Sequence, residues 1–264
     1  MDPAAALASA LTARGGPRLA AVEWHEEIGS TSDRVKDLAR AGAPTWTAVL
    51  ADRQSGGRGR EGRVWVSPPG GLYLSVLLRP EAARVSLLPL AAGVAVAEAV
   101  QELGVRAELK WPNDVLVGGR KLAGILAEAS SGGAGVEWVV LGIGVNVATD
   151  PERLPEAVRE TATSLAGSGA REASPTEVAA ATLARLASWY EVLRETPARV
   201  VAAWRSHAVP WWGEPVVVRS GAGERRGRLA AIDEEGALVL ETDAGESVRL
   251  VSGEVSRLRA AAAP

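Results

Sequence analysis

Residues 107–129 read AELKWPNDVLVGGRKLAGILAEA, and this stretch decides how the surrounding chain folds. Segments 107–117 and 121–129 are rich in apolar side chains of strand type, and Gly118-Gly119 separates them as a turn. Pro112 marks a strand edge or bulge, because proline restricts the residue before it and lacks an N–H donor. We therefore expect two neighbouring strands, with an interruption at the KWPND pentapeptide.

Apolar segments continue on both sides of these two strands. Residues 30–33, Ser-Thr-Ser-Asp, are typical helix N-caps, and apolar residues follow them at helical spacing. Strands are also predicted at 20–27, 47–51, 72–78 and 136–147, and helices at 85–103 and 175–205. This order predicts a domain of the α+β class.

The pattern changes after Pro210. Short strands are predicted at 216–219, 226–232, 237–241 and 247–251, separated by Gly-containing turns. They indicate a small barrel-like β domain. The Ala-rich start ends at Gly15-Gly16-Pro17 and is expected to be a short helix or a frayed arm. The predicted domains are an arm at 1–19, a main domain at 20–207 and a C-terminal domain at 208–264, with Trp211-Trp212 at the joint.

Composition narrows the class of protein. A chain of 264 residues with 47% hydrophobic residues can bury a sizeable core. It has no Cys and only two His, so disulfides, thiolate chemistry and His or Cys metal clusters are not expected. A net charge of -3 with interspersed Arg argues against a nucleic-acid-binding face. No leader is recognised, and no apolar run is expected to approach the length that spans a membrane, so a cytoplasmic protein is expected.

The distribution of lysine is informative. All basic residues except Lys36, Lys110 and Lys121 are Arg, so Arg supplies the ordinary surface cations. Arg is a planar fork, whereas Lys is a compact charge that can sit on a single oxygen. Lys110 and Lys121 fall within the stretch quoted above, which suggests that an ammonium group is required there; chance clustering is the alternative.

A loop rich in glycine and arginine lies at residues 56–63, GGRGREGR. Glycine lets backbone N–H groups turn toward an anion, and Arg adds donors that suit carboxylate or phosphate. The loop is therefore a candidate anion clamp, with a merely solvated loop as the alternative. It is not a Walker A loop, because the Gly-Lys-Ser/Thr ending is absent.

Three other segments leave two interpretations open. In the KWPND pentapeptide, Trp111 can be a core residue and Asn113-Asp114 a simple turn rather than part of a site. The alternating glycines of segment 141–147, LGIGVNV, indicate close approach of a ligand ring or of a packed helix. Residues Ser30-Thr31-Ser32 can cap a helix or bind the polar head of a ligand.

Taken together and in this order, the segments resemble the biotin protein ligases, also called biotin–[acetyl-CoA-carboxylase] ligases. Residues 57–65, GRGREGRVW, look like the family's biotin and adenylate loop; residues 110–114 look like its KWPND signature; and residues 121–126 look like its KLAGIL strand. The resemblance is specific from about residue 22 to residue 147 and rests on architecture elsewhere. It implies a class-II-synthetase-like mixed-sheet domain followed by a small SH3-like β-barrel.

The resemblance implies roles for individual residues. Those on the biotin side would be Ser30, Thr31, Ser32, Gln54, Arg58, Gly59, Arg60, Lys110 and Gly124, with Ser32 standing where many members have Asn. Those on the nucleotide side would be Arg60, Arg63, Trp65, Asn113, Lys121 and Asn146, with Trp65 next to the adenine. Lys110 would be the catalytic lysine, assisted by Arg58.

In the reaction of this family, biotin and MgATP give biotinyl-5′-AMP and pyrophosphate. A lysine on the biotin-carrier domain of a carboxylase then takes the biotin, and AMP leaves. Mg²⁺ is expected to arrive on the nucleotide, with Asp114 as the candidate to assist it and no separate metal site. The chain looks like the monofunctional type, because only about twenty residues stand where other members carry a winged helix. A homodimer through the central sheet would fit the family.

Two other functions stay open from the sequence. The first is a lipoate or octanoate ligase or transferase, a class of enzyme related to the biotin protein ligases in fold and chemistry. The second is a ligand-binding or regulatory protein with a degenerate site, against which the joint presence of Lys110, Arg58, Arg60 and Gln54 argues. A DNA-binding co-repressor is disfavoured, and neither nucleic acid nor membrane is an expected partner.

Overall fold

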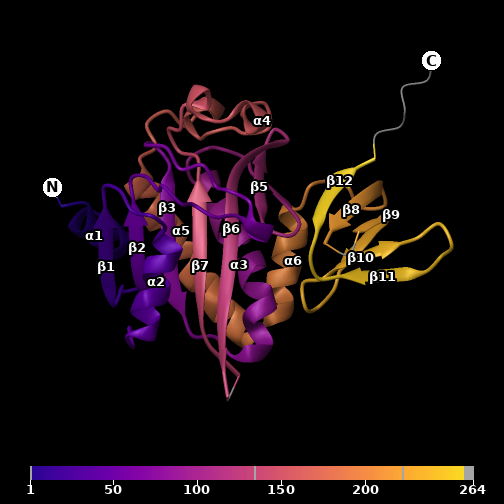
Figure 1. Ribbon diagram of the computed structural model, residues 1–264, viewed down its shortest axis with the longest axis horizontal. Helices are drawn as coiled ribbons and strands as arrows, with labels where there is room; N and C mark the ends of the chain where they lie inside the picture. Colours follow the sequence, from indigo (N-terminus) through magenta and orange to yellow (C-terminus); the bar gives the residue numbers. More distant parts are fainter. Residues whose placement is uncertain (1, 134, 222, 259–264) are drawn as a thin grey trace.

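The computed structural model describes residues 2–133, 135–221 and 223–258, which form two sheets (Figure 1). Within these ranges, the larger sheet has seven strands in the order β1-β2-β3-β7-β6-β5-β4. β1 and β2 pair in parallel, and the other neighbours are antiparallel. The strands are β1 (Ala21–His25), β2 (Thr47–Ala51), β3 (Leu72–Leu78), β4 (Glu108–Lys110), β5 (Asp114–Val117), β6 (Arg120–Gly132) and β7 (Gly135–Val145).

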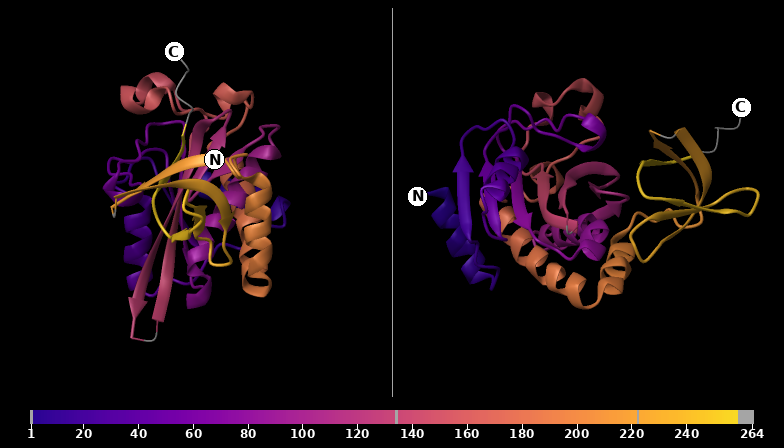
Figure 2. Two further views of the ribbon diagram at one scale, coloured as in Figure 1. Left: turned by 90° about the vertical axis from the view of Figure 1, so that its right-hand side faces the viewer. Right: turned by 60° about the horizontal axis from the view of Figure 1, so that its bottom comes forward.

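Helices cover both faces of this sheet (Figure 2). On one face, Val35 and Ala39 of α2 (Thr31–Arg40) pack in a small core with Val49. Ala48 and Leu50, the neighbours of Val49 in β2, belong to the main core on the other face. That core includes α3 (Leu88–Gln101), α5 (Pro175–Glu195) and α6 (Pro197–His207). Because both faces are covered, β2 is fully buried and its sequence is apolar throughout.

The Ala-rich start forms a helix, α1 (Pro3–Ala13), rather than a frayed arm. The side chain of Asp2 caps it by accepting a hydrogen bond from Ala4 N at 3.1 Å. Leu7 and Leu11 are buried in the main core, where α1 lies against α5. Burial of these two side chains attaches the beginning of the chain to the larger domain.

The expectation that no apolar run approaches membrane-spanning length is wrong for Ala83–Gln101. Among the described helices, this segment is the one with sufficient length and hydropathy. A short 3₁₀ turn, Ala82–Leu87, precedes α3, and α3 is buried along nearly its whole length. It is apolar on every side because the sheet and other helices surround it, as expected of a central core helix.

The predicted C-terminal β domain is confirmed as an antiparallel sheet. In the described residues its order is β11-β10-β9-β8-β12. The strands are β8 (Pro215–Ser220), β9 (Gly223–Ile232), β10 (Leu238–Glu241), β11 (Ser247–Leu250) and β12 (Glu254–Arg257). β12 was not predicted, because four residues after a glycine carry little periodicity. Residues 259–264 of the predicted C-terminal domain lie outside the described residues.

Two predicted elements were wrong in extent. Segment 107–117 is two strands, β4 and β5, which pair antiparallel around a turn at 111–113 with a cis Trp111-Pro112 bond. Segment 175–205 is two helices, because Pro197 begins α6 and cannot continue the hydrogen bonds of α5. The remaining short helix, α4 (Glu156–Arg159), lies in the segment that runs above the sheet in Figure 1.

The KWPND turn joins the two sheets. The indole Nε1 of Trp111 donates a hydrogen bond to Gly236 O in the C-terminal sheet at 3.0 Å, and the ring is buried. Leu109 O, at the end of β4, accepts from Val209 N at 2.9 Å. Trp111 is therefore a core residue, as the structural interpretation of the pentapeptide proposed, while its neighbours in the turn face a cavity.

Candidate functional site

A cavity of about 460 Å³ opens between the larger sheet and the loops above it. The start of α2, the turn after β4, strands β6 and β7, segment 154–162 and the β11–β12 turn contribute to its walls. Every predicted site residue lines this cavity: Ser30, Thr31, Ser32, Gln54, Arg58, Gly59, Arg60, Arg63, Trp65, Lys110, Asn113, Lys121, Gly124 and Asn146. The structure thus brings together residues that are more than a hundred positions apart in the sequence.

One group, the hydroxyl cluster, consists of Thr31, Ser32, Gln54, Ser67 and Ser75. Gln54 Oε1 accepts from Thr31 N at 2.9 Å and from Thr31 Oγ1 at 3.1 Å, and Gln54 Nε2 donates to Ser67 Oγ at 3.0 Å. Ser75 Oγ lies 2.8 Å from Thr31 Oγ1 and 3.0 Å from Ser32 Oγ. Ser67 Oγ donates to Trp65 O at 3.0 Å, so the cluster is one connected network.

The amide of Gln54 fixes the direction of this network. Its carbonyl oxygen can only accept, so Thr31 donates to it, Ser75 donates to Thr31 and Ser32 donates to Ser75. The hydroxyl protons of these three residues are then used inside the protein. The three residues line the cavity, and their remaining lone pairs can only accept, so the cluster favours a ligand that donates hydrogen bonds.

Ser30 has the capping role that its sequence position indicated. Its hydroxyl accepts from Asp33 N at 3.4 Å at the start of α2. The same residue lines the cavity, so capping and contact with a ligand do not exclude each other. Ser67 and Ser75 were missed, since single serines beside or within apolar strands give no motif.

The glycine- and arginine-rich loop is a short hairpin at residues 57–65. Gly59 N donates to Arg63 O at 2.7 Å, and Trp65 N donates to Gly57 O at 3.0 Å. Gly57 is needed in this hairpin because a Cβ there would collide with Trp65 O. We call this segment the 57–65 hairpin.

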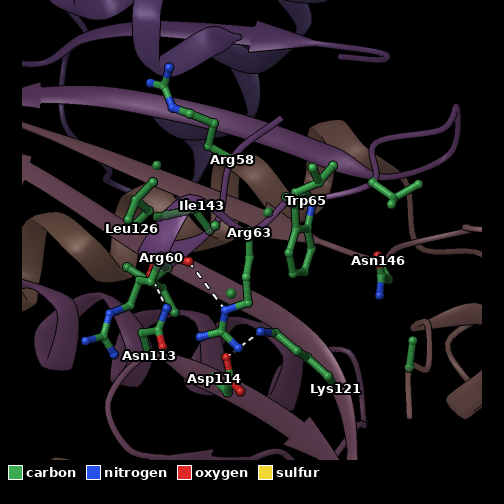
Figure 3. Close-up of a pocket in the computed structure, with 18 of the residues that line it drawn as sticks. Arg58, Arg60, Arg63, Trp65, Asn113, Asp114, Lys121, Leu126, Ile143 and Asn146 are labelled. Carbon is green, nitrogen blue, oxygen red and sulfur yellow. Dashed lines mark hydrogen bonds and ion pairs between the residues drawn. The ribbon is translucent and has the colours of Figure 1, made fainter. Parts of the chain in front are cut away.

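The arginines of the 57–65 hairpin point in two directions (Figure 3). Arg58 points away from the other labelled side chains and bonds two carboxylates, Asp33 and Glu128. Arg60 and Arg63 reach the C-terminal sheet: Arg60 Nη1 donates to Gly253 O at 3.5 Å, and Arg63 Nη1 pairs with Glu254 Oε2 at 2.8 Å. Burial lowers the pKa of Arg60, which reflects the cost of holding its charge away from water.

A second group, the charged cluster, consists of Arg60, Arg63, Asp114 and Lys121, which Figure 3 labels, together with Lys110. Lys121 Nζ pairs with Asp114 Oδ1 at 2.5 Å, and Lys110 Nζ lies 4.0 Å from Asp114 Oδ2. Lys121 also lies over the Trp65 ring, 5.4 Å from its centroid. Two of the three lysines therefore meet at one carboxylate, which supports the inference that ammonium groups are required here.

Trp65 explains the glycines of β6 and β7. Gly124 and Gly144 are direct cross-strand partners, and a Cβ on Gly144 would lie 2.6 Å from the indole. A Cβ on Gly142 would lie 2.8 Å from Ser32 Oγ of α2. The groups that approach the glycine backbone closely are thus the ring of Trp65, at Gly124 and Gly144, and helix α2, at Gly142. Trp65 Nε1 is buried and has no hydrogen-bond partner among the described residues.

The two predicted asparagines bond the backbone. Asn113 Nδ2 donates to Ile125 O at 2.7 Å, and Asn146 Nδ2 donates to Thr163 O at 3.0 Å. These bonds hold the KWPND turn against β6 and Thr163 against the residue that follows β7. Among the described residues, the amide oxygens of Asn113 and Asn146 have no hydrogen-bond donor.

The sequence did not identify the walls contributed by distant segments. Gly253 and Glu254 come from the C-terminal sheet, and Leu154 and Val158 come from the segment containing α4. Lys121 N donates to Thr161 O at 2.7 Å, which fixes that segment to β6. Within the described ranges, no group of three or more His, Cys, Asp or Glu residues could hold a metal ion. Asp114, the predicted helper of Mg²⁺, is paired with Lys121.

Two family models match this chain. Residues 24–146 match the biotin/lipoate A/B protein ligase family, and residues 212–258 match the biotin protein ligase C terminal domain. The two matched regions contain strands of the larger sheet and the C-terminal sheet, respectively. The cavity described above lies mainly in the first region and takes Gly253 and Glu254 from the second.

Curated relatives and a solved structure agree with these models. The bifunctional ligase/repressor BirA of Bacillus subtilis is 35% identical over 84% of this chain and 70% of its own length. The biotin–[acetyl-CoA-carboxylase] ligase of Paracoccus denitrificans is 38% identical over 76% of this chain and 86% of its own length. The biotin protein ligase of Aquifex aeolicus in complex with biotin and ATP superimposes with a TM-score of 0.75 at 32% identity, covering 92% of this chain and 100% of that one. The predicted fold class is confirmed.

Proposed function

This chain belongs to the biotin protein ligase family, and from that premise we propose how its own residues carry out the reaction. The enzyme is an ATP-dependent biotin protein ligase, which forms biotinyl-5′-AMP and transfers biotin to a lysine of a biotin-dependent carboxylase. The observation that carries the assignment of roles is the meeting of the hydroxyl cluster and the charged cluster in one cavity.

The hydroxyl cluster is the proposed site for the ureido head of biotin. A ureido group carries two N–H donors, and the directed network of Thr31, Ser32 and Ser75 presents acceptors to them. Gln54 Nε2 has a second N–H, which can donate to the ureido oxygen. An acyl chain or a dithiolane ring would leave these polar groups unpaired, and burying them without partners is costly. Biotin is thereby favoured over lipoate and octanoate.

The charged cluster is the proposed site of adenylation. The biotin carboxylate attacks the α-phosphate of MgATP, and negative charge increases on the phosphate oxygens while pyrophosphate leaves. Fixed cations that face this charge stabilise it, and Arg60, partly desolvated, suits an oxyanion. Gly59 and Gly124 would allow close approach, and Trp65 Nε1 is a buried donor that a nucleotide oxygen can satisfy.

The resemblance assigned the catalytic ammonium to Lys110, and the geometry gives Lys121 the stronger claim. Both lysines line the cavity, but Lys121 has the more exposed side chain, lies beside Gly124 and lies over the Trp65 ring. Lys110 is less exposed and also borders the joint with the C-terminal sheet. We therefore assign Lys121 to the reacting groups, with Lys110 holding Asp114 and through it Lys121. Asn113 and Asn146 act through the backbone that they fix.

Exchange of labelled pyrophosphate into ATP tests the function directly. We expect exchange in the presence of biotin and none with lipoate or octanoate, because only biotin presents donors to the hydroxyl cluster. Exchange with lipoate in place of biotin would show that the enzyme is a lipoate ligase. Absence of exchange with all three acids would favour a binding protein over an enzyme.

Several further assignments belong to the same proposal. The protein substrate is the biotin-carrier domain of a carboxylase, whose lysine would enter the cavity after adenylation. The domain division at 1–19, 20–207 and 208–264, a homodimer through the larger sheet and a cytoplasmic location all stay predictions. Size-exclusion chromatography with light scattering measures the oligomeric state.

A further inference from the structure

Four charged side chains form a network beside the cavity. Arg58 Nη1 pairs with Asp33 Oδ2 at 2.5 Å, and Arg58 Nη2 pairs with Glu128 Oε2 at 3.3 Å. Lys36, the third lysine of the chain, pairs with Glu128 Oε1 at 2.5 Å and with Asp33 Oδ1 at 3.5 Å. Two cations and two carboxylates therefore balance, and three elements meet in the network: α2, β6 and the 57–65 hairpin.

The position of Arg58 differs from the one expected of a ligand clamp. Arg60 and Arg63 lie on the side of Asp114 and Lys121, whereas Arg58 extends away from them (Figure 3) and pairs with Asp33 of α2. Its hydrogen bond with Asp33 raises the pKa of Arg58, and the same bond lowers the pKa of Asp33. If Arg58 left to bind an anionic ligand, two carboxylates would face Lys36 alone. The network thus stabilises Arg58 where it lies.

The opposite side of the hairpin is fastened as well. Arg63 pairs with Glu254, and Arg60 reaches Gly253 O, so the tip of the hairpin contacts the C-terminal sheet. Arg58, near the base of the hairpin, contacts α2 and β6. A hairpin held at two places can lie across the cavity with its backbone ordered.

We propose that Asp33 and Glu128 are positioning residues for the 57–65 hairpin, which they hold through the Arg58 side chain, with Lys36 keeping the two carboxylates in place. Arg58 then acts on the hairpin, and Arg60 is the arginine that meets the ligand anion. The effect of this hairpin on the reaction intermediate rests on the proposed function. A mixed anhydride must be kept from water and from escape until the acceptor lysine arrives, and a covering segment does this only while it stays closed.

The effect of this charged network on the 57–65 hairpin can be measured in the protein without any ligand. Amide hydrogen exchange of residues 57–65 should become about tenfold faster in the Asp33→Asn/Glu128→Gln double variant, as expected for residues coupled in one charged network. Asp37→Asn is the matched control, because Asp37 lies on the same helix and pairs with Arg40, which is not part of the network. Thermal unfolding of each variant checks that the fold is intact. Unchanged exchange in the double variant would overturn the proposal whether or not the protein is a ligase.

Retention of the intermediate distinguishes an anchor from a ligand clamp. After adenylation without acceptor, the double variant should release free biotinyl-AMP about tenfold faster than the wild type, and Arg58→Ala in the double background should add nothing further. Lys36→Met should show a smaller effect of the same sign. If neutralising both carboxylates slows release while Arg58→Ala speeds it, the carboxylates compete with the ligand for Arg58, and the proposal is wrong.

Discussion

The hydroxyl cluster and the charged cluster share one cavity but are built differently. The bonds of the hydroxyl cluster join neutral groups of the larger domain, which come from α2, β3 and the loop between β2 and β3. The charged cluster draws on the hairpin, the KWPND turn and β6, and it touches the C-terminal sheet through Arg63. A neutral, rigid network suits recognition of a constant head group, whereas charges on loops suit a reaction in which charge moves and products leave.

The largest expected difference between the two clusters comes from removing Lys121, the cation at the centre of the charged cluster. Lys121→Ala should slow biotin-dependent pyrophosphate exchange by about a hundredfold or more, because a fixed charge facing the α-phosphate is lost. Affinity for biotin, measured by calorimetry without ATP, should remain near that of the wild type, since the hydroxyl cluster is untouched.

Lys110→Ala is the companion variant. We expect a smaller loss of exchange, because Lys110 lies 4.0 Å from Asp114 and acts through it. A larger loss in Lys110→Ala than in Lys121→Ala would restore the assignment drawn from the resemblance.

The hydroxyl cluster is tested by Gln54→Ala. This change removes the acceptor of Thr31 N and of the Thr31 hydroxyl, and it removes the donor to Ser67 Oγ. The hydroxyl groups of the network are then no longer held in one direction. Leaving buried polar groups unpaired costs about 1–3 kcal/mol each, so biotin affinity should fall about tenfold to a hundredfold while the rate at saturating biotin changes little.

Gln101→Ala, at the exposed end of α3, is the control for the loss of an amide side chain. A variant at Gln54 that binds biotin normally but has lost its rate would place Gln54 in the chemistry instead.

The smallest effect is expected where the charged cluster meets the C-terminal sheet. Glu254→Gln removes an ion pair whose two side chains are both about half exposed, and such pairs contribute less than about 1 kcal/mol. The KM for ATP should rise by no more than about threefold, and the difference should shrink in high salt. Steady-state kinetics at two ionic strengths measures this. A change confined to biotin affinity would show that Glu254 does not act through the hairpin.

The sequence predicted well those features that depend on neighbouring residues. β2 and β3 begin and end where their apolar runs do, and Ser30 caps α2 as its side chain indicated. The family motifs carried the site, because the residues they contain gather around one cavity. Their individual roles stay predictions.

Other features depend on pairing between distant segments. Ser75 joins the hydroxyl cluster because β3 lies beside the start of α2. A single serine in an apolar strand does not predict this contact. Glu254 reaches Arg63 only because the two sheets are packed together. The direction of Arg58 was not foreseen either, since the sequence gives its charge but not the carboxylates that hold it.

The paired glycines of β6 and β7 constrain how this cavity can change over evolution. Gly124 and Gly144 stand opposite each other, and together they leave the space that the Trp65 ring fills. A side chain gained at Gly144 has no room until position 65 becomes smaller, whereas a smaller residue at position 65 first leaves a hole. Either substitution alone should therefore destabilise the protein more than both substitutions together. Positions 65 and 144 should thus vary together among homologues rather than one at a time.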